Sequence, residues 1–467
     1  MQTQMQTQTQ RHLGLVLHYR KTGTMTSKLR LTTLAALTAF TALTAALIVT
    51  GAANAQTASK NAAASAPAAA ASGPVAPTIR PDFGKPLIEA QALLAEKKIG
   101  PAKAKIALAE AMADKTPYEN FILARLKLSA AIDEDDAAGA TQLMERLLVL
   151  NEGTGSAPGS TSWIKPDELP RLLQAVAISH YRTKSYEQAA AWTERSIKAG
   201  SVDQKSQDIR LQSYFLANNF AKTTELAEEE IAAAQKAGRP PAFNALELLA
   251  QSRDKLKDVP GGTRAIELLV QYYPKKDYWQ SLVNRIWSKA DLATRLQLDV
   301  FRLASQLGTL SERNDYSEYV DYAQKAGYSG EALRAFDAGV AAGFLGAGAD
   351  AAKDQKLRTK LVTESEQDKK TQAADIANAL KKPDGTGMVT VGLGLVGAQQ
   401  FDKGLELMEK GIAKGVPKRP EEARLHLAIA YAWAGQTDKA IQTFATVSGK
   451  EGLDELARYW AMAIRKP

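Results

Sequence analysis

The residues of this chain that come closest to a chemical motif are the glycines of segment 392–397, which reads Gly-Leu-Gly-Leu-Val-Gly. The spacing G-x-G-x-x-G is typical of dinucleotide sites, where glycines let the backbone approach a pyrophosphate. Such a site also needs a helix directly after the loop and an acidic residue about twenty positions further on, ending a second strand. Segment 410–415 instead has the composition of a helix end, and no strand-like segment follows it. We therefore interpret 392–397 as part of a repeat helix, and an enzyme with a nucleotide loop there is the least favoured hypothesis.

The acidic run 133–136 is a second candidate, because alternating carboxylates are typical of calcium loops. An EF-hand loop requires a glycine at its sixth position and a glutamate at its twelfth. Counted from Asp133, these positions hold Ala138 and Met144. The run is better explained as the acidic first turn of a helix, where negative charge is stabilised by the helix dipole.

Histidine and cysteine usage argues against catalysis. The chain has four histidines and no cysteine, and only His180 and His426 lie beyond the N-terminal leader. Nothing in the sequence suggests a Ser/His/Asp triad, paired catalytic carboxylates or a metal-binding cluster. We therefore expect no catalytic residues, no metal and no cofactor, and a protein that is not an enzyme.

The N-terminus has the pattern of a secretory signal. Lys28 and Arg30 precede an apolar stretch, 31–49, and residues 53–55 form an Ala-x-Ala cleavage site. We expect cleavage after Ala55 and a periplasmic or secreted protein with no stable membrane span in the mature chain. Residues 1–24 are a leader extension, and a true start at Met25 would give a signal, 25–55, of ordinary proportions. The apolar stretch is long, so an uncleaved anchor is the alternative.

Removing the leader changes the charge argument. Residues 1–55 hold five Lys and Arg and no Asp or Glu, so the net charge of +8 falls to +3 in the mature chain. This small excess argues against nucleic acid as a partner. The absence of cysteine excludes disulfides and a lipid anchor at the cleavage site, so stability must come from apolar packing.

Beyond a flexible Ala/Pro/Ser-rich linker, 56–85, almost the whole chain has helical periodicity. We expect N-terminal helix pairs over 86–150, the first broken at Gly100-Pro101 and the second starting at Thr116 and Pro117. A long loop, 151–170, regular repeats, 171–260, and degenerate helical repeats, 261–384, follow. The degenerate part is expected to contain helix pairs in 277–306 and 349–380. The last part, 385–467, contains two clear repeats and a capping helix.

Two helix pairs are in register at 34 residues. Ala177, His180, Tyr186 and Ala189 correspond to Leu211, Tyr214, Phe220 and Thr223. Near the C-terminus, Gly392, Phe401, Gly404 and Met408 correspond to Ala428, Thr437, Ala440 and Phe444 at a spacing of 36. A period of this size indicates stacked helix pairs, each too small to bury its own apolar face. The predicted fold class is all-α, an α-solenoid of stacked helix hairpins.

These segments resemble tetratricopeptide-repeat proteins, most closely over 173–197, 207–231 and 425–447. The chain departs from the family pattern at Thr223, where alanine is expected, and where 42 residues separate Thr223 from Ala265. The resemblance implies an α-superhelix that binds peptides or protein segments in its groove. It implies no chemistry.

The first helix of each pair should line the concave face of such a superhelix. One stripe there reads Gln174, Ile178, Tyr181 and Arg182, and 34 residues later Asp208, Gln212, Phe215 and Leu216. We predict partner-binding residues at Gln174, Tyr181, Arg182, Gln212 and Phe215. Alternatively, the two aromatic side chains pack against the neighbouring repeat.

The function that follows is a periplasmic scaffold or adaptor that binds a peptide or protein segment of a cell-envelope complex. The alternative is an envelope carbohydrate or peptidoglycan binder. It is motivated by the aromatic cluster Tyr272, Tyr273, Tyr278, Trp279 and Trp287, which could stack sugars. Such a cluster more often fills the junction of irregular helix pairs.

Overall fold

The computed structural model describes residues 78–152 and 162–465, and every regular element in these ranges is a helix. The predicted leader, the signal and most of the linker lie outside the described residues, as does the middle of the 151–170 loop. The described chain divides into two compact units, 78–262 and 263–465, called here the N-terminal and C-terminal units. The division falls within helix α11 (Val259–Tyr272).

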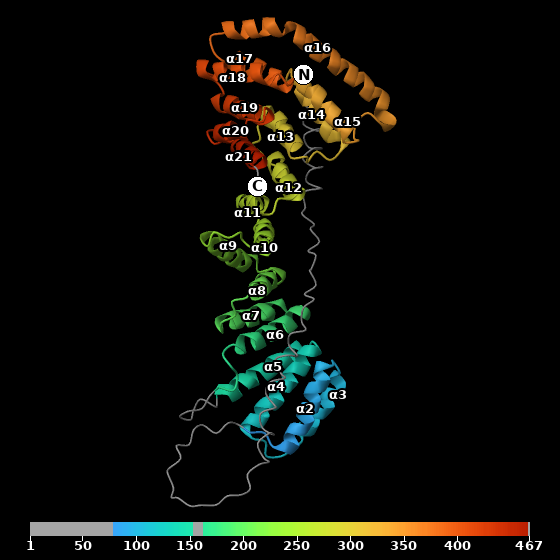
Figure 1. Ribbon diagram of the computed structural model, residues 1–467, viewed down its shortest axis with the longest axis vertical. Coiled ribbons are helices and arrows are strands. Elements are labelled where there is room, and N and C mark those ends of the chain that lie inside the picture. Colours follow the sequence, from blue (N-terminus) through green and yellow to red (C-terminus); the bar gives the residue numbers. More distant parts are fainter. Residues whose placement is uncertain (1–77, 153–161, 466–467) are drawn as a thin grey trace, which may run out of the picture. The chain divides into compact units, whose positions relative to one another are not determined.

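The N-terminal unit consists of consecutive helix pairs (Figure 1). Its helices are α2 (Pro81–Ala95), α3 (Ile99–Glu110), α4 (Pro117–Asp133), α5 (Ala137–Glu152), α6 (Leu169–Arg182), α7 (Tyr186–Lys198), α8 (Gln204–Leu216), α9 (Phe220–Lys236) and α10 (Phe243–Lys255). The first helices of the pairs, α2, α4, α6, α8 and α10, contact one another in sequence. The second helices pack against the first helices on either side. The first helices therefore form a continuous inner row, and the second helices form the outer layer.

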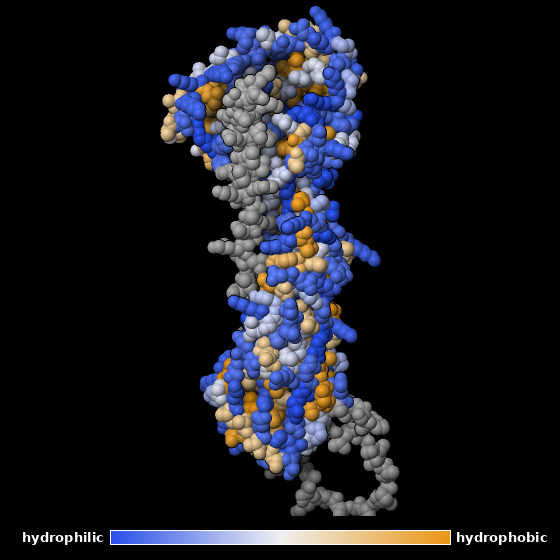
Figure 2. Space-filling view, turned by 180° about the vertical axis from the view of Figure 1, so that it is seen from behind, coloured by the Kyte–Doolittle hydropathy of each residue, from blue (hydrophilic) through white to orange (hydrophobic). Residues whose placement is uncertain are grey.

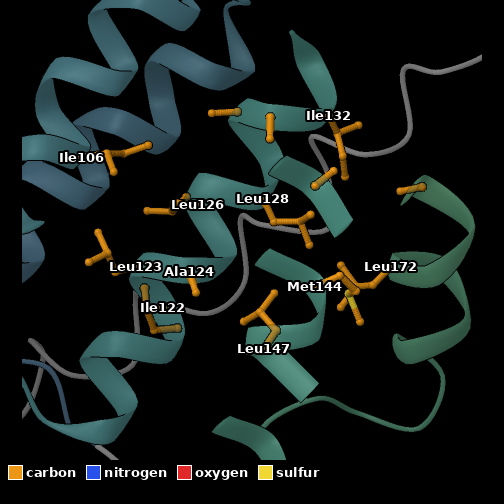
Figure 3. Close-up of a cluster of buried hydrophobic side chains, with 14 of the residues drawn as sticks. Ile106, Ile122, Leu123, Ala124, Leu126, Leu128, Ile132, Met144, Leu147 and Leu172 are labelled. Atoms are coloured by element: carbon orange, nitrogen blue, oxygen red, sulfur yellow. The ribbon is translucent and has the colours of Figure 1, made fainter. Parts of the chain in front are cut away.

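The core of the N-terminal unit lies between the two layers (Figure 3). Leu128 of α4, Met144 and Leu147 of α5 and Leu172 of α6 point toward one another and are almost fully buried. Alanine at the helix crossings allows close approach, since Ala177 and the alanine at 189 are fully buried. The small residues that define the repeat in the sequence are thus the residues at which helices cross.

The turn within most of the pairs has one recurring geometry. One residue there has a positive φ, and the next residue donates its backbone N–H to the carbonyl five positions earlier. In the pair α6–α7, Lys184 has φ 62° and Ser185 N–H donates to His180 O at 2.8 Å. The equivalent positive-φ positions in other pairs are Lys97, Asp135, Asn218, Lys257, Gly327, Gln399 and Gly435. This Schellman arrangement pairs carbonyls that the end of a helix would leave free.

The C-terminal unit contains two sets of helices joined by one long helix (Figure 1). The helices before it are α12 (Lys276–Trp287), α13 (Gln297–Gln306), α14 (Arg313–Lys325) and α15 (Ser329–Ala341), with short 3-10 turns at Thr294–Leu296 and Gly348–Asp350. After α16 (Ala351–Lys381) come α17 (Thr386–Gly397), α18 (Phe401–Lys414), α19 (Pro420–Trp433), α20 (Thr437–Phe444) and α21 (Leu453–Ile464). Contacts of α15 with α17, and of α13 with α21, bring the two sets together.

The helix α16 corrects one prediction. A helix pair was expected in 349–380, but α16 is a single helix of 31 residues. Its sequence contains neither glycine nor proline, so nothing in it ends a helix. The pair expected in 277–306 is present as α12 and α13, and the predicted capping helix is α21.

The extra glycines of α17 and α18 are explained by an unusually close helix crossing. A Cβ built at Gly392 would lie 2.7 Å from the carbonyl oxygen of Gly404, and one at Gly404 would lie 2.6 Å from that of Gly392. The backbones are equally close where α17 begins, since a Cβ at Gly385 would lie 1.7 Å from the carbonyl oxygen of Gly411. Segment 392–397 is therefore part of a repeat helix, as we interpreted it.

Three further boundaries differ from the sequence-based expectation. The helix α2 begins at Pro81, inside the expected linker. Gly100 and Pro101 lie in the first turn of α3, where proline is tolerated because the N–H it lacks has no helical partner. The acidic run 133–136 covers the end of α4 and the turn to α5 rather than a helical first turn, and within it Asp136 caps α5 by accepting from Gly139 N–H at 2.9 Å. The predicted start at Thr116 is confirmed by its capping box with Glu119.

Among the described residues, no helix combines the length and the apolarity that crossing a membrane requires.

Candidate functional site

Polar side chains connect three helices of the inner row in the N-terminal unit. The Tyr181 hydroxyl of α6 donates to Gln212 Oε1 of α8 at 2.9 Å. Gln212 Nε2 donates to Asn244 Oδ1 of α10 at 3.4 Å, and Asn244 Nδ2 donates to Asp208 Oδ1 at 3.3 Å. We call these four residues, Tyr181, Gln212, Asn244 and Asp208, the amide ladder.

Three members of the amide ladder occupy two positions of the repeat, and the fourth, Gln212, occupies the position of Ile178 in the preceding repeat. Gln174, Asp208 and Asn244 occupy one position on successive first helices, and Tyr181, Phe215 and Gln251 lie seven residues after each of them. A step of seven residues returns to the same face of a helix. The inner row therefore presents one face with a polar and a mainly aromatic position in each repeat.

Four of the five predicted site residues lie together on this face. Gln174 of α6 donates to Ser206 Oγ of α8 at 2.7 Å, while Tyr181 and Gln212 belong to the amide ladder. Phe215 is half-buried beside them on α8. Arg182 points elsewhere, since it donates to Ile132 O at 2.8 Å and pairs with Asp135 at 2.8 Å in the α4–α5 turn.

The two predicted aromatic residues pack partly within their own repeats. Tyr181 lies edge-on to Tyr186 with ring centroids 5.6 Å apart, and Phe215 contacts Phe220 in the same way at 5.4 Å. Each ring thus braces the start of the second helix in its pair. Both remain only half-buried, so part of each ring is still open to a partner.

Burial makes the charges on this part of the molecule costly. Desolvation raises the pKa of Asp208, although hydrogen bonds from Gln204 and Asn244 oppose the change. Desolvation likewise raises the pKa of Glu230, whose Oε2 is buried without a hydrogen-bond partner. Gln251 Nε2 on α10 is also buried and unpartnered. Glu230 Oε2 and Gln251 Nε2 can therefore each form a hydrogen bond that no described residue supplies.

Sequence reasoning missed Asn244 and Gln251. The regular spacing of 34 would place their positions at 242 and 249, but the longer connection before α10 shifts the register by two residues. The enlarged spacing between Thr223 and Ala265 was the signal that the register changes in this region.

A pocket of about 370 Å³ lies in the C-terminal unit, between the α14–α15 turn, α16 and α17. Of segment 392–397, Gly394 and Leu395 line it, but they belong to a helix and so offer no free backbone N–H groups to a phosphate. Residues of α16 line its other side. The sequence could not reveal the pocket, because α16 was expected to be two short helices.

A buried ionic cluster joins the two helix sets of the C-terminal unit. Arg302 of α13 donates to both carboxylate oxygens of Glu331 at 2.8 Å and to Asp299 at 2.7 Å. His426 of α19 approaches Asp299 at 3.2 Å. The charges of Glu331 and Asp299 raise the pKa of Arg302 against the effect of burial. Each charge has a partner, so the cluster is structural.

The remaining candidates do not form reactive sites. His180 bonds to Thr141 at 2.7 Å, and desolvation lowers its pKa. Among the described residues, no group of three or more His, Cys, Asp or Glu could hold a metal. In the aromatic cluster suggested for sugars, Tyr278 is buried and Trp287 packs edge-on against Phe301.

Comparison with family models gives no match, and comparison with curated proteins gives none either. Among solved structures, one match is a chain of Naa15/Naa10 bound to HypK-THB, at 12% identity and a TM-score of 0.19. It covers 81% of this chain and 64% of that one, so this chain spans less than two thirds of its length. Yeast Tom70 matches at 14% identity and a TM-score of 0.17, over 82% of this chain and 95% of that one. The described helices and their contacts themselves form an all-α solenoid of stacked helix pairs.

Proposed function

We propose that this protein is a non-enzymatic scaffold that binds an extended segment of a partner protein along the inner row of the N-terminal unit. The amide ladder is the observation that carries the proposal. Its carboxamides both donate and accept hydrogen bonds, as an extended peptide backbone requires. The half-buried rings of Tyr181 and Phe215 add flat apolar area next to them.

The proposed setting is the periplasm, with the partner belonging to a cell-envelope complex. This part rests on the signal pattern at residues 25–55. Fractionation of cells that express a C-terminally tagged chain should recover the protein in the periplasm with Gln56 as its first residue. Recovery in the cytoplasm with an intact N-terminus would contradict it.

The binding proposal is tested by capture from envelope extracts with tagged mature protein. Wild type should recover a defined partner, and Gln212→Ala with Asn244→Ala and Gln251→Ala should reduce its recovery at least tenfold. A matched control replaces the exposed outer-layer residues Glu187, Gln188 and Glu229 with alanine. Capture that survives the first triple variant, with helicity intact by circular dichroism, would exclude this face as the site.

A further inference from the structure

The pocket of the C-terminal unit has a floor of small residues and a polar rim. Gly327 of the α14–α15 turn, Gly330 in the first turn of α15, Gly387 and Gly394 of α17 and Ala398 just after it line the pocket without long side chains. The hydroxyphenyl ring of Tyr328 and the side chain of Leu395 add apolar surface. Figure 2 shows hydrophilic side chains along the arch of helices at the top of the view, with hydrophobic patches on its inner side. A volume of about 370 Å³ lies within the range of ligand pockets.

Two glycines of this floor are not explained by packing. A Cβ built at Gly394 would meet only Tyr328, at 3.5 Å, and one built at Gly387 would come no closer than 3.7 Å to Ala379. These are ordinary contact distances, unlike those at Gly392. Glycine in a helix costs about 1 kcal/mol relative to alanine. What the two glycines provide is open space, and both border the pocket.

The rim is formed by one face of α16 and carries charges of both signs. Asp368, Lys369, Asp375 and Lys382 line the pocket, and none of them forms an ion pair with any residue in the part of the chain that the structure describes. Between them, Gln372 bonds to Gln400 at 2.7 Å across the pocket. The rim therefore offers two acidic and two basic groups to a ligand above an apolar floor.

From these features we infer that the pocket is a docking site for a short peptide segment. One large apolar side chain of that segment enters the cavity between α15, α16 and α17, and flanking residues of opposite charge pair with the rim. An aromatic side chain suits the volume and the apolar surface that Tyr328 and Leu395 provide. This site is separate from the amide ladder, and the inference does not depend on the proposed function of the N-terminal unit.

The test uses the full mature chain and the probe acetyl-Lys-Trp-Asp-amide, with 5-fluorotryptophan observed by ¹⁹F NMR. The probe should bind at least tenfold more tightly than acetyl-Lys-Ala-Asp-amide, measured by competition. Gly394→Leu should weaken binding at least tenfold, because the new side chain fills the cavity. Ala373→Leu is the control, since it places the same leucine side chain at an exposed position of α16 outside the pocket.

A second variant keeps the test decisive if Gly394→Leu fails to fold. Asp368→Lys with Asp375→Lys changes only exposed side chains and should favour acetyl-Asp-Trp-Asp-amide over the original probe at least threefold. Equal binding of the tryptophan and alanine probes would overturn the inference. So would free tryptophan binding as tightly as the peptide, which would assign the pocket to an amino acid. Gln212→Ala with Asn244→Ala should leave probe binding unchanged, which separates this site from the amide ladder.

Discussion

Arg302 is the residue on which the buried charges of the C-terminal unit depend. Its guanidinium bonds to Glu331 and Asp299, and all three side chains are about 1% exposed. Arg302→Met would leave two buried carboxylates without their cation. Removing one partner of a buried ion pair costs about 3–5 kcal/mol. We expect a loss of that size in the free energy of unfolding, measured with urea.

Its control is Arg358→Met, which breaks the exposed pair of Arg358 with Asp337 at 2.8 Å. Exposed pairs contribute little because water and salt screen them. The control should therefore change stability far less. Similar losses in both variants would show that burial does not determine the effect.

The ionised carboxylate of Glu119 predicts that the N-terminal unit loses stability in acid. Its buried carboxylate accepts hydrogen bonds from Arg80 at 2.9 and 3.0 Å and from Thr116 N–H at 2.9 Å. These bonds, chiefly that from the Arg80 side chain, lower the pKa of Glu119 from 4.5 to about 2. A lowered folded-state pKa stabilises the fold above the unfolded pKa, and this contribution is lost as pH falls from 4.5 toward 2.

Urea unfolding at pH 6, 4 and 3 tests this pH dependence of the free energy of unfolding. Glu119→Gln should be less stable than wild type at pH 6, and the difference should shrink as the pH falls. A difference that stays constant from pH 6 to pH 3 would contradict an ionised Glu119 as its source.

At the scale of helices, the sequence predicts local structure better than contacts between helices. The helix start at Thr116 follows from local rules and is confirmed. The register of Asn244 depends on which helices stack on which. The bonds of Arg182 to the preceding turn depend on the same packing. A periodic pattern does not contain that information, so it placed only part of the candidate site.

Replacing two glycines of α17, Gly392 and Gly394, with alanine should change stability in opposite directions. A Cβ at Gly392 would lie 2.5 Å from Met408 Cγ and 2.7 Å from a backbone oxygen of α18. Gly392→Ala should therefore separate α17 from α18 and destabilise the fold by about 1–3 kcal/mol. Gly394→Ala meets no such contact and should stabilise by about 0.5–1 kcal/mol, because alanine favours the helix.

Thermal unfolding of the two glycine variants gives the comparison directly. The expected result is a lower melting temperature for Gly392→Ala and a higher one for Gly394→Ala. If both variants are stabilised, the α17–α18 crossing is looser than the structure shows.

At the scale of the whole molecule, two compact units predict more than one unfolding transition. In a stack of repeats, each helix pair is stabilised mainly by its neighbours, so cooperativity need not extend along the chain. Glu119 belongs to the N-terminal unit and Arg302 to the C-terminal unit. In calorimetry, Glu119→Gln and Arg302→Met should therefore lower different transitions. A single transition shifted by both variants would contradict independent units.

The contact of α13 with α21 determines where helix pairs can be inserted into or deleted from such a chain. In the N-terminal unit, first helices follow one another in an open row, so an extra helix pair inserted there would find the same kind of neighbour on each side. In the C-terminal unit, early and late helices meet, and Asp299 and His426 bridge 127 positions of sequence. An inserted pair there would force these partners apart. Duplication and deletion of repeats should therefore be tolerated in the N-terminal unit, while the C-terminal unit is held to a fixed number of helices.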